Sequence, residues 1–345
     1  MITSKPLVSL CCSTHSRPDV FAFALKGLLR QTYAPLEIVV LVDGSNPLAI
    51  ALLNACDDPR LRWFATSRPS GMVAAWNKVV AASRGKYFLY CADDDVLCDS
   101  AIESQVELLE THPNVGFCHA DFYLINDEGD RMGQWQSHEG TWIKAGLAEW
   151  QRYLAQPKCC MQTCVIRRDL WERVGGWDED AGYPGDNSLY LKLLRLNDVG
   201  HVARFVCSYR IRTRNPDSWR KNANKVQADF ALASKHLMTA PELLRAQVPA
   251  LERMVRKHLA HNALAVLADH RGTAEERAEF ASWVLDELLY RSRHQMLYRW
   301  LLRLHLERAL SHLKSLEHFS RTVIRTALAN INKMTANPAS LKKTA

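Results

Sequence analysis

The chain has 345 residues, a formal net charge of +7, 48% hydrophobic residues and 23% charged residues. This composition excludes wholly disordered and fibrous proteins, and the length suffices for two domains. We expect no membrane-spanning helix, because no uncharged apolar stretch is long enough, and no secretory signal at the start of the chain. Ten cysteines without a CxxC pair predict reduced, buried thiols rather than disulfides or a zinc site.

Predicted strands and helices alternate through the first third of the chain. Strands are predicted at 7–12, 37–42, 61–65, 86–91 and 115–120, and helices at 19–30, 47–56, 72–83 and 99–111. This alternation predicts an α/β fold with a mainly parallel sheet flanked by helices. Ligands bind such sheets at the carboxyl ends of the strands, where this chain has polar clusters at 13–17, 43–45 and 93–95.

The acidic cluster Asp93-Asp94-Asp95 follows a predicted strand. Adjacent carboxylates repel one another and are costly to bury without a cation. Oxygen ligands suit Mg²⁺ or Mn²⁺, which commonly bridge to phosphate oxygens, so the cluster predicts a metal that holds a diphosphate. The alternative is an acidic turn that caps the next helix.

Three further polar residues each allow two interpretations. Asp186 begins an amphipathic helix and is either its N-cap or a general base that faces a cleft. Asp43 either accepts hydrogen bonds from a base or sugar, or belongs to an ordinary Asp-Gly turn. Arg17 either binds phosphate or lies on the surface ahead of a helix.

Taken together, these residues resemble the family 2 glycosyltransferases of the GT-A fold, over about residues 6–215. Leu7–Pro18 resembles the family's opening "vSvIIPTYNRP", and Glu37–Ser45 resembles "EIIVVDDGS". Ala92–Asp95 falls on the DXD motif, and Gly185-Asp186 falls on the "ED" pair. The other matching segments are Ala74–Tyr87, Val115–Arg131 and Arg167–Glu179.

The resemblance implies an inverting, metal-dependent transfer of a sugar from a nucleoside diphosphate sugar, UDP- or dTDP-linked, in surface polysaccharide assembly. The acceptor would be a hydroxyl of a glycan or a lipid-linked molecule. Asp186 would deprotonate that hydroxyl, Asp95 would ligate Mn²⁺ or Mg²⁺, and Asp43 would bind the base. The donor-binding residues that the resemblance implies are Thr14, Arg17, Asp43, Asn77, Asp93, Asp94 and Arg212.

The sequence departs from the family pattern at six positions, among them Ser13 in place of a Pro and His15 in place of a Tyr. Ala92 replaces the first Asp of the DXD motif, Trp76 replaces an Arg, and Gly185 replaces the usual Glu. Arg212 stands where many members have a His, and it could clamp the diphosphate but cannot ligate a metal. Trp76, Gly185 and Arg212 support an alternative, a non-catalytic relative that binds a nucleotide sugar or a glycan as a partner subunit. The chain lacks GxGxxG and Walker motifs, which argues against a dehydrogenase or nucleotidyltransferase.

Near residue 220 the composition of the sequence changes: glycine becomes rare and long helical patterns dominate. We predict a catalytic domain at 1–220 and a helical, basic extension at 221–345, where residues 288–345 hold 11 basic and two acidic residues. An amphipathic helix at 295–317 is expected to pack on protein, including a second copy of the chain, or else to lie on an anionic membrane. We expect no nucleic-acid partner, and a cytoplasmic protein that could be peripheral on the inner face of the cell membrane.

Overall fold

The computed structural model describes residues 5–137, 139–155, 159–182, 184–211, 218–267 and 272–288. The chain divides into two compact units, Met1–His258 and Leu259–Ala345, and the predicted catalytic domain lies wholly within the first. The basic helix predicted at 295–317, with its membrane and self-association roles, lies outside the described residues. Within the described residues, no helix has the length and apolar character needed to cross a bilayer.

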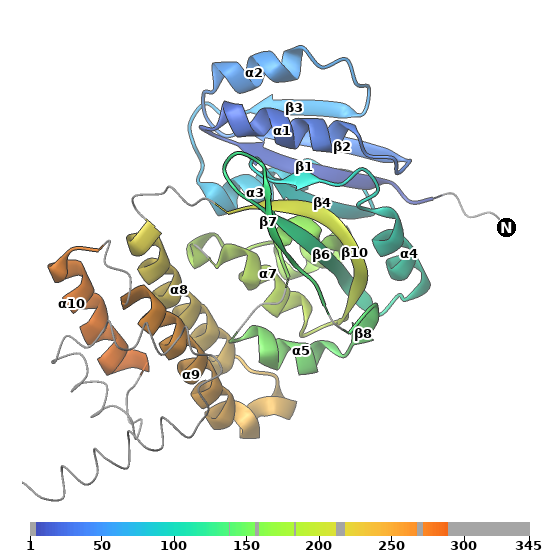
Figure 1. Cartoon of the computed structure of the whole chain (residues 1–345). Helices are drawn as coiled ribbons and strands as arrows, with labels where there is room; N and C mark the ends of the chain where they lie inside the picture. The colour runs from blue at the N-terminus through green and yellow to red at the C-terminus, as the bar shows by residue number, and fades with distance from the viewer. Residues whose placement is uncertain are drawn as a thin grey trace, which may run out of the picture. The chain divides into compact units, whose positions relative to one another are not determined.

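The first unit is built on a ten-stranded sheet with the order β3-β2-β1-β4-β9-β6-β10-β5, to which β7 adds beside β6 and β8 beside β10 (Figure 1). The strands are β1 (Val8–Thr14), β2 (Leu36–Val42), β3 (Leu61–Ala65), β4 (Tyr87–Ala92), β5 (Val96–Leu97), β6 (Val115–Ile125), β7 (Arg131–Trp135), β8 (Trp142–Lys144), β9 (Val165–Arg167) and β10 (Asp198–Arg210).

Helices connect the strands and continue after them. They are α1 (Pro18–Leu29), α2 (Pro47–Asn54), α3 (Met72–Ala81), α4 (Glu103–Thr111), α5 (Gly146–Tyr153), α6 (Arg168–Val174), α7 (Gly185–Leu193), α8 (Ser218–Met238), α9 (Val248–Leu267) and α10 (Ala274–Trp283). Helix α9 spans the boundary between the two units, and α10 belongs to the second unit.

The parallel half of the sheet has the arrangement that the sequence predicts. Strands β3, β2, β1 and β4 are parallel, and the burial of β1, β2 and β4 on both faces explains why these three read as continuous apolar runs. Thr14 pairs with Val42, and Ser13 pairs with Ala92, so β1, β2 and β4 end at one edge. The polar segments after these strands are therefore brought together.

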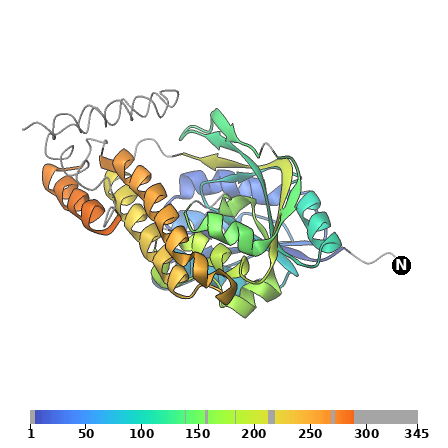
Figure 2. The same ribbon diagram turned by 90° about the horizontal axis from the view of Figure 1, so that it is seen from below.

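Beyond β4 the sheet is mixed rather than mainly parallel. The short strand β9 lies antiparallel between β4 and β6, and β10 is parallel to β6 but antiparallel to β5 and β8. Strands β6, β7 and β10 lie side by side in both views (Figure 2). The physical reason for the difference is the insertion of β9, which separates the β1–β4 group from the β6–β10 pair.

Helix α5 packs against the connection between α7 and β10 at Gly146. A Cβ at this position would lie 2.0 Å from the carbonyl oxygen of Asn197 and 2.5 Å from that of Leu194. Both neighbours are backbone atoms, which cannot move aside as a side chain can. Only glycine fits here without a shift of the backbone.

Gly146→Ala should therefore lower the free energy of unfolding by roughly 1–3 kcal/mol, the usual cost of overpacking. Urea denaturation followed by tryptophan fluorescence measures the change. Gly133→Ala is the matched control, because the nearest atom to its Cβ would be the Leu124 Cδ1 at 3.7 Å, an ordinary contact. Equal losses in the two variants would contradict the packing described for α5.

Candidate active site

A cleft of about 910 Å³ lies at the carboxyl ends of β1, β2 and β4. Its lining continues through the segment 159–162, the start of α7, the end of β10 and one residue of α8. The polar side chains that line it are Ser13, Thr14, His15, Ser16, Arg17, Asp43, Tyr90, Asp93, Asp94, Asp95, Gln162, Asp186, Asn187, Tyr209, Arg210 and Lys225. Among the predicted site residues, Thr14, Arg17, Asp43, Asp93, Asp94, Asp95 and Asp186 therefore share one cleft.

Asp43 directly follows β2 and is 5% exposed. Its carboxylate accepts hydrogen bonds from the Ser70 backbone N–H at 2.9 Å, the Ser70 hydroxyl at 2.5 Å and the Thr66 hydroxyl at 3.0 Å. Burial alone would raise the pKa of Asp43, but these donors outweigh it and hold the pKa below its ordinary value. Asp43 is thus an ionised carboxylate at one end of the cleft, fixed in place by the segment after β3.

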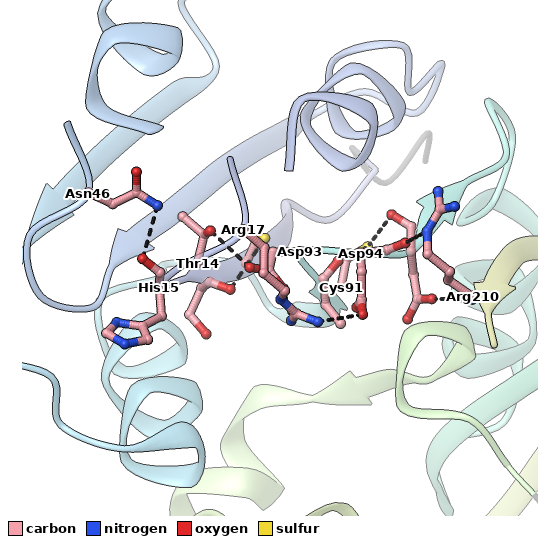
Figure 3. Close-up of polar contacts among 12 residues, drawn as sticks. Thr14, His15, Arg17, Asn46, Cys91, Asp93, Asp94 and Arg210 are labelled. Carbon is pink, nitrogen blue, oxygen red and sulfur yellow. Dashed lines mark hydrogen bonds and ion pairs between the residues drawn. The ribbon is translucent and has the colours of Figure 1, made fainter. Parts of the chain in front are cut away.

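Arg17 joins the loop after β1 to the acidic cluster after β4 (Figure 3). Its guanidinium donates to Asp93 Oδ1 through Nη2 and to Asp94 Oδ2 through Nη1, the latter at 2.6 Å. Thr14, 1% exposed, donates its hydroxyl to Asp93 Oδ2 at 2.9 Å. Burial raises the pKa of Asp93, while the Arg17 charge opposes that shift. Arg17 is therefore a cleft residue, not a surface residue ahead of a helix.

Asp95 lies deeper than its two neighbours and is 1% exposed. Its Oδ1 accepts the backbone N–H of Arg210 at 2.7 Å, while Arg210 Nε donates to the Asp94 carbonyl oxygen at 2.9 Å. Burial and the neighbouring Asp94 charge raise the pKa of Asp95 well above its usual range. The cluster is thus bound to the end of β10 and does not merely cap the next helix.

The side chains that could ligate a metal in the cleft suit a divalent ion only in part. Carboxylate oxygens of Asp94 and Asp95 line the cleft and are the hard ligands that Mg²⁺ and Mn²⁺ prefer. No group of three or more His, Cys, Asp or Glu side chains that could hold a metal occurs among the described residues. One or two carboxylates completed by substrate phosphates is a usual arrangement for Mg²⁺, and these residues fit that arrangement.

Asp186 stands in the first turn of α7, where Pro184 is the N-cap residue. Its Oδ1 accepts the Asn187 backbone N–H at 2.9 Å. Burial raises the pKa of Asp186, and the ammonium of Lys225 opposes that shift. Lys225, on α8, is held by Asp229 one turn later at 2.9 Å. A carboxylate with a raised pKa that faces a cleft is suited to accept a proton.

The structure explains two of the departures from the family pattern together. Trp76 lines the cleft and packs against Tyr90 and Trp177, with ring centroids 5.6 and 5.9 Å apart. A Cβ at Gly185 would lie 2.7 Å from Val73 Cγ2 and 3.1 Å from Trp76 Cζ3. The indole and Val73 thus occupy the space that a side chain at position 185 would need, and Gly185 lets α7 approach α3 closely.

The structure does not bring the predicted donor-binding residue Asn77 into the cleft. The Asn77 amide exchanges two hydrogen bonds of 3.0 Å with the Trp177 backbone, and Asn77 does not line the cleft. We therefore no longer propose it as a donor contact, because its polar atoms hold the segment before α7. Arg212 lies outside the described residues.

Sequence reasoning missed Arg210 and Lys225 as members of the site. Arg210 is 7% exposed and also donates to the Asn126 and Asp127 carbonyl oxygens at 2.8 Å each, so it joins β10 to the β6–β7 turn. Its signal was an arginine at the end of an apolar strand, which needs buried acceptors. Lys225 and Asp229 lie four residues apart on a helix. This spacing indicates an ion pair, but it does not show that Lys225 lines the cleft.

The structure confirms the prediction of buried thiols for six of the ten cysteines, and the other four are partly exposed. All ten cysteines are free, and six of them are buried. Cys159 and Cys160 line the cleft without forming part of a described metal cluster. Burial raises the pKa of both thiols well above the usual value, so neither is an activated nucleophile.

The fold and the cleft define a class: an α/β protein with a charged, polar cleft at the carboxyl ends of its parallel strands. Residues 9–175 match Glycosyl transferase family 2. This region is therefore a family 2 glycosyltransferase domain, and the resemblance drawn from the sequence is confirmed.

Among curated proteins, an uncharacterized glycosyltransferase of Rickettsia typhi is 24% identical over 57% of this chain and 61% of its own length. The O-antigen biosynthesis protein RfbC of Myxococcus xanthus is 26% identical over 67% of this chain and 19% of its own. Chondroitin synthase of Escherichia coli is 24% identical over 60% and 29%. The chain thus spans at most about three fifths of these relatives.

Solved structures share the GT-A fold at low sequence identity. TarS 1–349 of S. aureus in complex with UDP has a TM-score of 0.58 at 14% identity, covering 88% of this chain and 87% of that one. The mannosyltransferase PcManGT of Pyrobaculum calidifontis, in complex with GDP-Man and Mn²⁺, has a TM-score of 0.53 at 18% identity, with 92% and 89% covered. These likenesses confirm the predicted fold class.

The contact between α3 and α7 can be tested directly. Gly185→Ala should destabilise the protein by about 1–3 kcal/mol, because the added methyl meets Val73 and Trp76. Adding Val73→Ala removes the closest atom, Cγ2, and should recover part of that loss in a double-mutant cycle of urea unfolding. Strict additivity of the two substitutions would contradict the packing that links these positions.

Proposed function

We propose that this protein is an inverting glycosyltransferase of surface polysaccharide assembly. It moves a sugar from a UDP- or dTDP-linked donor to a hydroxyl of a glycan or lipid-linked acceptor. The observation that carries the proposal is that Asp43, the Arg17–aspartate cluster and Asp186 line one cleft. The family 2 domain and the relatives named for O-antigen biosynthesis and chondroitin synthesis support it.

The cleft gives each part of the donor a neighbour of suitable chemistry. Asp43, ionised at one end, accepts an N–H from the base. The diphosphate lies toward Arg17, whose guanidinium suits paired hydrogen bonds to phosphate oxygens. The anomeric carbon then lies near Asp186, which lines the same cleft.

The proposed reaction is a single displacement at the anomeric carbon. The acceptor oxygen attacks from the face opposite the diphosphate, the carbon–oxygen bond to the diphosphate breaks, and Asp186 takes the acceptor's proton. One carboxylate suffices as base, and no covalent sugar–enzyme intermediate forms. The leaving nucleoside diphosphate keeps the electron pair of the broken bond.

Asp94 and Asp95 would hold a divalent metal together with the donor's diphosphate. When bound, Mn²⁺ or Mg²⁺ supplies Lewis-acid stabilisation of charge on the leaving diphosphate. The chain's own contribution is to fix this cluster: Arg210 donates its backbone N–H to the Asp95 carboxylate and its Nε–H to the Asp94 carbonyl oxygen, and Thr14 holds Asp93.

The test is donor turnover. UDP-, dTDP- and GDP-sugars are incubated with the protein and acceptor sugars, and released nucleoside diphosphate is measured. We expect release from one donor class, and a loss of about a thousandfold or more in Asp186→Asn with nucleotide binding retained, as for removal of a catalytic base. Nucleotide binding without turnover on any acceptor would favour the partner-subunit alternative, and no nucleotide binding would overturn both.

The pH dependence of kcat/KM tests the role of Asp186 as base. Activity should be present above its raised pKa and lost as pH falls through it, because a protonated carboxyl accepts no proton. Lys225→Met removes the neighbouring ammonium, so the pKa should rise further and the acid limb should move up by roughly half to one pH unit.

Lys221→Met is the matched control for this shift. Lys221 lies one turn earlier on α8 and does not line the cleft, so its removal should leave the acid limb in place. An acid limb that is unmoved in Lys225→Met, or moved equally in both variants, would contradict the assignment.

A further inference from the structure

The acidic cluster already has a cation, and that cation is a side chain. Arg17 donates to Asp93 Oδ1 and to Asp94 Oδ2, and its own side chain is 37% exposed at the cleft. The Asp94 side chain is 15% exposed and Asp93 is 4% exposed. The ion pair with Asp94 therefore lies at the cleft wall, where a ligand can reach it.

We propose that Arg17 is a built-in counter-ion that competes with a divalent metal for Asp94, and that it moves to the donor's diphosphate when the metal binds. This inference rests on the proposed function for the identity of the diphosphate. Its metal half stands on the described contacts alone and needs no donor.

The competition follows from geometry and charge. The Nη1–Oδ2 distance of 2.6 Å is that of a strong charge-assisted hydrogen bond, so Oδ2 is directed at the guanidinium. A metal at the usual oxygen distance of roughly 2.1 Å would place two like charges against each other on one carboxylate. A metal that takes Oδ2 must therefore break the contact with Arg17, and a metal that takes Oδ1 is opposed by the guanidinium charge on the other oxygen.

The two partners of Arg17 differ: a metal in the cleft can replace the guanidinium at Asp94 but not at the buried Asp93. Asp93 is held from its other side by Thr14, and burial disfavours its charged form unless a cation is near. Arg17 thus has a buried partner that a metal in the cleft does not replace. A donor diphosphate offers new acceptor oxygens to the guanidinium, so metal and donor should load together rather than separately.

The test compares Mn²⁺ binding in two variants without any donor. Arg17→Gln alone leaves the buried Asp93 unpaired and is expected to fold poorly, so Asp93→Asn and Arg17→Gln/Asp93→Asn form the matched pair. Mn²⁺ alone is titrated, and free Mn²⁺ is read from its electron paramagnetic resonance signal. The double variant should bind Mn²⁺ about tenfold more tightly than Asp93→Asn, which corresponds to one lost ion-pair competitor.

Two further variants locate the effect. Adding Asp94→Asn to the double variant should abolish the gain, because the competed carboxylate is gone. Arg30→Gln breaks the exposed ion pair with Asp99, which does not line the cleft, and should leave Mn²⁺ affinity at the wild-type value. Equal Mn²⁺ affinity in the matched pair, or a gain that survives Asp94→Asn, would overturn the competition.

The diphosphate half has its own readout. With Mn²⁺ at a concentration that saturates both proteins, calorimetry should give a UDP affinity about tenfold weaker for the double variant than for Asp93→Asn, because the guanidinium that meets the diphosphate is missing. Equal UDP affinities would overturn the transfer of Arg17 to the diphosphate. A protein that binds Mn²⁺ as expected but turns over no donor would count against the proposed function and not against the competition.

Discussion

The site depends on one electrostatic constraint: three consecutive carboxylates at the end of β4 must each find a partner in a partly dehydrated cleft. Arg17 meets Asp93 and Asp94, and the Arg210 backbone meets Asp95. These contacts join the loop after β1 to the end of β10, two strands that β4, β9 and β6 separate in the sheet. The charged side chains that would bind a diphosphate and its metal are thus the same ones that hold the walls of the cleft together.

A second constraint comes from close packing on the far side of the cleft. Gly185 allows α7 to lie against Val73 and Trp76, and this places Asp186 at the cleft wall. The two departures from the family pattern that seemed to weaken the site are one steric arrangement. An aromatic side chain replaces an arginine, and a glycine makes room for it, while the carboxylate next to the glycine keeps its place.

Much of this could be predicted from the sequence because the parallel strands carry strong, local signals. Buried apolar runs ending in polar residues predict β1, β2 and β4, and their shared edge follows from parallel pairing. Strand β9 could not be predicted, since its three residues merge with the start of α6. Asn77 matches its family motif but does not line the cleft, because it is hydrogen-bonded to the distant Trp177 backbone. The sequence does not show such a contact. Lys225 comes from a helix after the matched region.

The most direct test of the account is calorimetric titration of UDP into the wild-type protein and into Asp43→Asn. The substitution keeps a side-chain oxygen for Ser70 and Thr66 but places an amide N–H₂ where the base would be received. The account predicts saturable binding to the wild type and an affinity lower by about tenfold or more in the variant. Absence of binding of UDP, dTDP and GDP to the wild type, or equal affinity in both proteins, would contradict the assignment of this cleft as a nucleotide-sugar site.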